Sequence, residues 1–163
     1  FYICSSTAIE KNLIIQFQKS LNYFSLMRYF NIYCKLILSF MNYDLNPFEG
    51  LCFLYYEMAH AGGNFDNNKQ EKVKQNTKLW VDQVEGIELE NTLKKAFTQW
   101  MSSGPETRID FVINGLLPNI KNSLNDGERQ TVLDHLWEIG STDGDLSSDE
   151  EDFYNLAVDR LDV

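Results

Sequence analysis

Apolar residues at helical spacing, interrupted by glycine, proline and asparagine turns, constrain the fold of this chain more than any other feature. From residue 41 onward, apolar side chains recur at intervals of three and four residues, as in Leu51, Leu54, Tyr55 and Met58. This interval is the period of an amphipathic α-helix. No stretch of strand length alternates apolar and polar residues. The sequence therefore predicts an all-α fold, a compact helical bundle.

Turn residues divide this region into six expected helices. Pro47 marks the first start, because a proline at the first helical position loses no hydrogen bond. Pro118 is expected to kink or end the fourth helix, since a proline inside a helix removes a donor and clashes with the preceding turn. The breaks between helices are Gly62-Gly63, Gly86, Ser103-Gly104-Pro105, Asn125-Asp126-Gly127 and the glycine turn at Gly144.

An internal repeat relates two parts of the helical region. When the chain is shifted by 81 residues, the turn 62–66 lies over the turn 143–147. The preceding helices then align Leu51 with Val132, Tyr56 with Trp137, Glu57 with Glu138, and Met58 with Ile139. In each copy a glycine permits the turn, and Asp66 or Ser147 can cap the helix that follows. The sequence therefore predicts a bundle built from two similar helix–turn–helix halves.

The turn of the second copy is rich in carboxylates: Asp143-Gly144-Asp145-Leu146-Ser147-Ser148-Asp149-Glu150-Glu151. Ser147 and Glu150 have the spacing of a capping box, in which each side chain bonds the backbone N–H of the other residue. The acidic residues after Ser147 also face the positive end of the helix dipole. The local sequence thus predicts a helix that begins after Ser147, whether or not an ion binds.

The same carboxylates are candidate ligands for a divalent cation, because calcium is bound by carboxylate oxygens. A complete EF-hand loop is excluded, since its first ligand position would fall on Ile139, whose side chain has no oxygen. A partial and weak Ca²⁺ site is still expected. Its ligands would be Asp143, Asp145, Glu150 and, one turn earlier, Glu138.

The segment from Asp143 to Glu150 resembles the motif of the TerB-like family of tellurite-resistance proteins, and related modules occur in membrane-anchored DnaJ-like co-chaperones. The resemblance covers roughly Phe48 to Val163. It implies a compact all-α bundle of two such halves. It also implies a non-enzymatic stress-response protein that binds divalent cations and works beside membrane partners of the tellurite cluster.

The first copy of the repeat departs from the family pattern. Gly62 stands where the family has Asp, and Lys69 stands where it has Glu. A metal site that used acids from both halves would therefore lack half of its ligands in this chain. For this reason the predicted cation ligands lie in and beside the second turn alone.

Charge is distributed unevenly along the chain. Residues 1–40 carry four basic and one acidic side chain, a charge of +3, whereas residues 41–163 carry 10 basic and 23 acidic ones, a charge of −13. An acidic body repels phosphate backbones and anionic headgroups, so neither nucleic-acid binding nor direct membrane insertion is expected. The expected partner is a protein with a basic surface or a membrane protein of the tellurite cluster. An acidic interaction or scaffold domain without metal is the alternative function.

Residues 1–40 form an atypical leader before the predicted TerB-like domain at 41–163. They hold nine of the 22 aromatic residues but no glycine or proline. Three origins stay open: a helical extension, an interfacial amphipathic segment, or an upstream or artificially added stretch with Met41 as the natural start. Arg28 and Lys35 interrupt the apolar run and argue against a transmembrane helix.

Three cysteines, Cys4, Cys34 and Cys52, are odd in number and have no metal-ligand spacing. They are interpreted as free thiols in a reducing compartment. A cytoplasmic location follows, with attachment to the inner face of the membrane only through a partner.

No enzymatic motif is present, and the protein is not expected to be an enzyme. The rival hypothesis is a hydrolytic site combining His135, Glu138 and Asp143, but a histidine and a carboxylate three residues apart on a helix are common by chance. A cluster of lysines on the second helix is expected to be a solvated face. It comprises Lys69, Lys72, Lys74 and Lys78.

Overall fold

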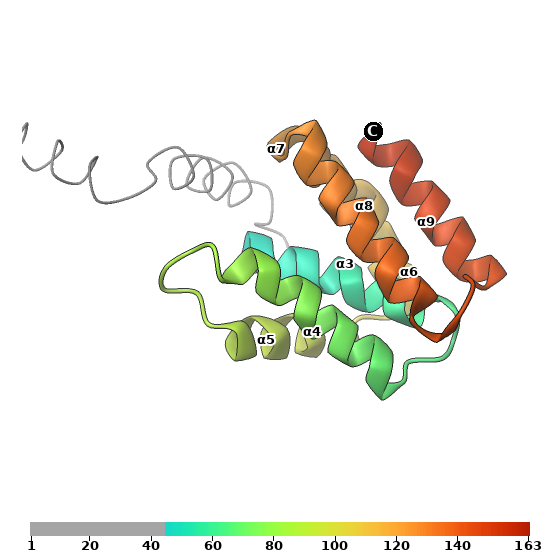
Figure 1. Ribbon diagram of the computed structural model, residues 1–163, viewed down its shortest axis with the longest axis horizontal. Helices are drawn as coiled ribbons and strands as arrows, with labels where there is room; N and C mark the ends of the chain where they lie inside the picture. Colours follow the sequence, from blue (N-terminus) through green and yellow to red (C-terminus); the bar gives the residue numbers. More distant parts are fainter. Residues whose placement is uncertain (1–44) are drawn as a thin grey trace, which may run out of the picture.

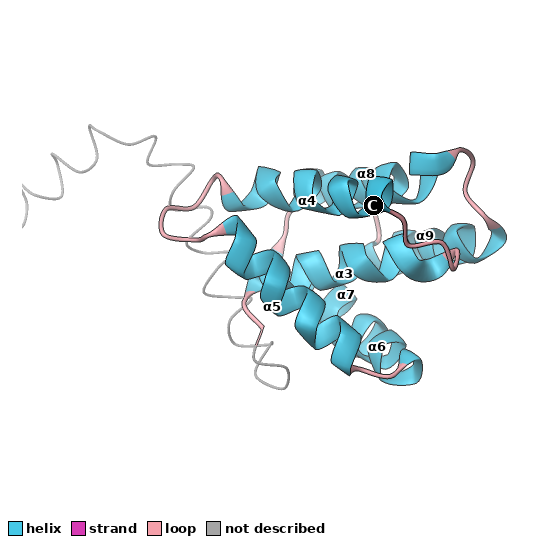
Figure 2. Ribbon diagram, turned by 90° about the horizontal axis from the view of Figure 1, so that it is seen from below, coloured by secondary structure: helices cyan, strands magenta, loops and turns pink. Residues whose placement is uncertain are grey.

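The computed structural model describes residues 45–163, which form helices joined by short loops (Figures 1 and 2). The α-helices are α3 (Pro47–Ala61), α4 (Asn67–Val81), α5 (Leu89–Ser102), α6 (Pro105–Phe111), α7 (Leu117–Ser123), α8 (Asp126–Gly140) and α9 (Ser148–Leu161). A π-helical segment, Val112–Leu116, joins α6 to α7, and a 3₁₀ turn, Ser141–Asp143, follows α8. No strand occurs in this part of the chain, so the all-α prediction is confirmed. The leader at 1–40, with Cys4 and Cys34, lies outside the described residues.

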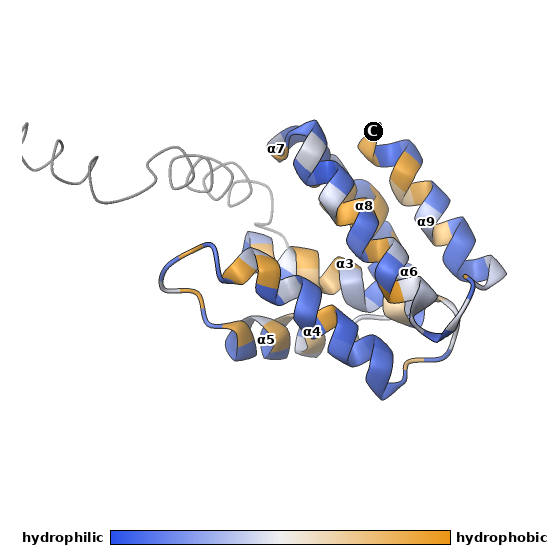
Figure 3. Ribbon diagram, viewed as in Figure 1, coloured by the Kyte–Doolittle hydropathy of each residue, from blue (hydrophilic) through white to orange (hydrophobic). Residues whose placement is uncertain are grey.

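Helix α3 is the centre of the bundle. All of its residues from Pro47 to Ala59 are buried, including Cys52, which is a free thiol as expected. A helix that is apolar on every side must be covered on every side. Accordingly, α3 packs against α4, α5, α8, α9 and the π segment. By contrast, α4 is hydrophilic along most of its length (Figure 3). None of the helices between residues 45 and 163 has the length and apolarity that crossing a membrane requires.

The two predicted helix–turn–helix halves are α3–α4 and α8–α9, and they pack on each other through α3 with α8 and α9 and through α4 with α8. Capping boxes start both halves. Asn46 and Glu49 cap α3, and Asn125 and Glu128 cap α8. The predicted turn at 125–127 is therefore wrong beyond Asn125, because the helix already begins at Asp126. The cap satisfies the first N–H groups, so Gly127 does not break the helix.

Pro118 does not end the fourth helix, which continues to Ser123, but a π-helical segment, Val112–Leu116, interrupts the regular α-helix directly before the proline. The N–H of Leu117 donates to the carbonyl of Val112, five residues earlier. A π turn is wider than an α turn. We attribute the π turn to the proline, whose ring would clash with the carbonyl four residues before it in a regular helix.

A buried hydrogen-bonded group links both halves. The Trp80 indole N–H donates to the Tyr55 hydroxyl oxygen at 2.9 Å, and the Tyr55 oxygen lies 2.8 Å from His135 Nδ1. The Trp80 N–H also points at His135 Nδ1, at 3.3 Å, so Nδ1 is an acceptor and carries no proton, and the Tyr55 hydroxyl can donate its own hydrogen to it. Burial lowers the pKa of His135, and this outweighs the raising effect of Glu138 and Asp134. The histidine is therefore neutral in the fold.

This burial predicts a loss of stability in mild acid. The unfolded chain gains the His135 proton below about pH 6.5, before the folded chain does, so the free energy of unfolding falls as pH drops from that value toward the lower folded pKa. We expect a loss of up to about 2 kcal/mol between pH 7 and pH 5. His135→Asn keeps an acceptor near Nδ1 but cannot be charged. Urea unfolding of this variant should show a smaller pH dependence by that amount, and an equal dependence in both proteins would contradict the assignment.

Candidate functional site

The acidic turn between α8 and α9 forms the predicted helix start. The Ser147 backbone N–H donates to Glu150 Oε2 at 2.8 Å, and the Glu150 N–H reaches Ser147 Oγ at 3.4 Å. Gly144 has a φ of +135°, a backbone conformation that disfavours other residues. The capping box is therefore confirmed, and it fixes the carboxylate of Glu150 at the first turn of α9.

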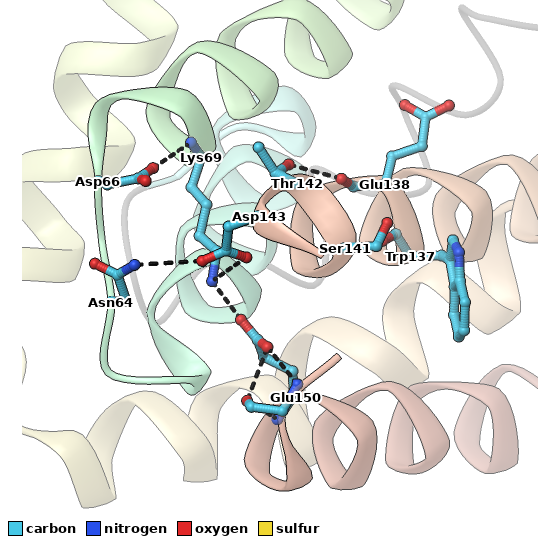
Figure 4. A network of polar contacts seen from close by, with 10 residues as sticks. Asn64, Asp66, Lys69, Trp137, Glu138, Ser141, Thr142, Asp143 and Glu150 are labelled. Atoms are coloured by element: carbon cyan, nitrogen blue, oxygen red, sulfur yellow. Dashed lines mark hydrogen bonds and ion pairs between the residues drawn. The ribbon is translucent and has the colours of Figure 1, made fainter. Parts of the chain in front are cut away.

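Lys69 reaches this carboxylate from the other half of the repeat (Figure 4). Its ammonium forms an ion pair with Glu150 Oε1 and lies 3.6 Å from Asp143 Oδ1. The Lys69 side chain is 1% exposed and that of Glu150 is 3% exposed. The prediction that Lys69 lies on a solvated face is thus wrong, whereas Lys78 on the same helix is 55% exposed. Lys78 thus lies on the predicted solvated face of α4, whereas Lys69 points inward and neutralises the buried carboxylate of Glu150.

Several contacts favour the charged form of Glu150. Burial by itself raises the pKa of this carboxyl group, because the charged form loses hydration. The hydrogen bond from Lys69 and the two from Ser147 outweigh burial, so the pKa of Glu150 is lowered overall. The carboxylate is therefore ionised, and its partners come from α4 and from its own capping residue.

The structure does not bring the four predicted cation ligands together in one place. Asp143 and Glu150 both face Lys69, whereas the Glu138 side chain points away from it and lies 3.8 Å from Lys72 (Figure 4). The Asp145 side chain is exposed and forms no hydrogen bond or ion pair with another described residue. Between residues 45 and 163, no group of three or more His, Cys, Asp and Glu side chains is arranged to hold a metal ion. Cation binding at this turn stays a prediction.

The first turn of the repeat completes the site. Asn64 Nδ2 donates to Asp143 Oδ2 at 3.3 Å. Gly62 lies so close to the second turn that a Cβ atom there would come 2.7 Å from Glu150 Oε1 and 2.9 Å from Ser147 Oγ. The two turns are thus packed against each other, and Gly62 is required by that approach and not by its φ of −76°.

The residues of the rival hydrolytic site are all engaged in other contacts. His135 is buried and bonded to Tyr55, Glu138 faces Lys72, and Asp143 contacts Lys69 and Asn64. These contacts give no support to a shared active site.

A second feature, which the sequence did not predict, is a pocket of about 400 Å³ between the end of α3 and the starts of α6 and α9. Ile109, Phe153 and Leu156 supply apolar surface, and Asp149 and Asp152 supply carboxylates. The spacing of Asp149, Asp152, Phe153 and Leu156 places them on one face of a helix. That spacing was the available signal, but the opposite walls of the pocket come from distant parts of the chain.

The fold and the site define a class of protein: an all-α bundle of two helix–turn–helix halves that pack on each other, with their turns in contact. The family model described as tellurite resistance protein TerB matches residues 49–163. The chain therefore belongs to the TerB family, as its second turn predicted. No curated protein and no solved structure matched the chain.

The surroundings of Gly62 and Gly127 predict opposite effects when each glycine is replaced by alanine. Gly62→Ala should lower the free energy of unfolding by about 1–3 kcal/mol, because the added methyl group overlaps Glu150 and Ser147. Gly127→Ala should raise it by up to about 1 kcal/mol, because its Cβ meets its nearest atom at an ordinary 3.5 Å and alanine favours the helix. Urea unfolding followed by tryptophan fluorescence measures both. A neutral Gly62→Ala would contradict the described packing of the turns.

Proposed function

We propose that this TerB-family domain is a non-enzymatic module of the tellurite-resistance type, which acts in a cytoplasmic stress response by binding a basic and apolar segment of a protein partner. The binding surface is the pocket between α3, α6 and α9. The observation that carries the proposal is the combination of apolar surface and carboxylates in this pocket.

The chemistry of the pocket favours a cationic amphipathic segment. Ile109 is 37% exposed, and it lies with Phe153 and Leu156 beside the carboxylates of Asp149 and Asp152. Both carboxylates are exposed, and neither forms an ion pair with a described residue, so both are available to a ligand. An apolar side chain and a Lys or Arg from one partner segment would match this surface.

The positively charged side chain that lines the pocket, Arg108, does not change its preference for a basic ligand. Arg108 Nε lies 2.9 Å from Glu57 Oε2, and its guanidinium stacks on the Trp100 ring at 4.5 Å from the ring centre. Trp100 Nε1 also donates to Glu57 Oε2 at 2.6 Å. Arg108 is therefore neutralised by Glu57 and held in the wall of the pocket. The charges that face a ligand are the acidic ones.

The charge of the whole domain supports the same partner chemistry. Residues 41–163 carry a charge of −13, which attracts basic segments over distances of about 10 Å at moderate salt. Loops on the cytoplasmic side of membrane proteins are enriched in Lys and Arg. A basic cytoplasmic segment of a membrane protein of the tellurite cluster is accordingly the partner that we propose.

Binding should be measured with a fluorescein-labelled amphipathic peptide that has a Leu face and a Lys face. The double variant Asp149→Asn/Asp152→Asn should raise the Kd roughly 2- to 30-fold, since exposed ion pairs contribute about 0.2–1 kcal/mol each. Glu151→Gln/Asp159→Asn removes the same charge from the same helix outside the pocket and should have a smaller effect. Equal weakening in both variants would show that the peptide responds to overall charge and not to the pocket.

A further inference from the structure

The ion pair of Lys69 and Glu150 lies at equivalent positions of the repeat. The two residues are 81 positions apart, which is the offset that superposes the two halves in sequence. The same offset relates Gly62 to Asp143. Two symmetric copies of the second half would bring four carboxylates together at this place. In this chain one copy supplies two carboxylates, and the other supplies an ammonium group and a glycine.

The residues present do not fit the divalent cation that the family resemblance implies. Such a cation needs several oxygen ligands, and an ammonium group is a donor with no lone pair. Lys69 Nζ already occupies the space between Glu150 and Asp143, and the second oxygen of Glu150 accepts from the N–H of Ser147 at 2.8 Å. A metal ion beside the ammonium would be repelled by its charge.

Gly62 fits the same interpretation. A side chain at this position would collide with Glu150 Oε1 and Ser147 Oγ, since even its Cβ would approach within 2.9 Å of both. The glycine therefore allows Glu150 to lie against the first turn, where Lys69 meets it. Lys69 thus supplies the positive charge that pairs with Glu150, and Gly62 leaves the space that the Glu150 carboxylate needs.

We propose that the Lys69 ammonium takes the place of a bound divalent cation, as the positive charge that joins the two halves of the repeat. The domain then folds without metal, and calcium does not regulate it. This inference is independent of the pocket between α3, α6 and α9.

The proposal is tested by thermal unfolding of the full chain, stripped of metal, in chelator and in millimolar Ca²⁺. The wild-type Tm should be the same in both conditions. Lys69→Met keeps the length of the side chain but leaves Glu150 buried without its cation, and should lower Tm by about 10 °C. The matched control is Lys72→Met. Lys72 lies one turn further along α4, is 32% exposed and has a 3.8 Å contact with Glu138, so its effect should be much smaller.

A second variant tests the place of the cation. Lys69→Glu replaces the ammonium with a carboxylate, so that three carboxylates meet there with those of Asp143 and Glu150. Millimolar Ca²⁺ should raise the Tm of this variant, or restore its helical circular dichroism if it is unfolded in chelator. Three results would each overturn the proposal. The first is a saturable rise in the wild-type Tm with Ca²⁺ that Glu150→Gln abolishes. The second is a Lys69→Met variant no less stable than Lys72→Met, and the third is a Lys69→Glu variant that does not respond to Ca²⁺.

Discussion

The ion pair between Lys69 and Glu150 is the interaction on which the contact between the turns of the two halves depends. Both groups are almost fully buried, so each would be costly without the other. Glu150 also accepts two hydrogen bonds from Ser147, which starts α9. One carboxylate therefore begins a helix and holds two turns together. The close approach at Gly62, and the contact of Asn64 with Asp143, follow from the same arrangement.

Most of the fold was predictable because its determinants are local. Pro47 at the start of α3, Asp66 at the start of α4 and Ser147 at the start of α9 act on neighbouring N–H groups, so their roles can be inferred from a few adjacent residues. The exceptions also have physical causes. Asn125 caps a helix that Gly127 was predicted to interrupt, and the π turn before Pro118 depends on backbone adjustment that residue types do not reveal.

The site was predictable only in part, because its partners are distant in sequence. The capping box needs Ser147 and Glu150 alone, and the sequence showed it. The inward turn of Lys69 depends on a carboxylate 81 residues away, and a lysine among other lysines gives no local sign of burial. The repeat contained the missing information, since Lys69 and Glu150 align. The pocket near α6 was missed for the same reason, since its walls meet only in the folded chain.

The opposite charges at one position of the repeat also determine which halves can associate. Two first halves would bring lysine against lysine, and two second halves would bring glutamate against glutamate in a buried place. Like charges buried together are strongly unfavourable, so only unlike halves fit. An ordinary internal duplication leaves its copies interchangeable. Here the pair of Lys69 and Glu150, with Gly62 beside it, helps to make the copies complementary, and it disfavours the mismatched assemblies that similar sequences in one chain would otherwise permit.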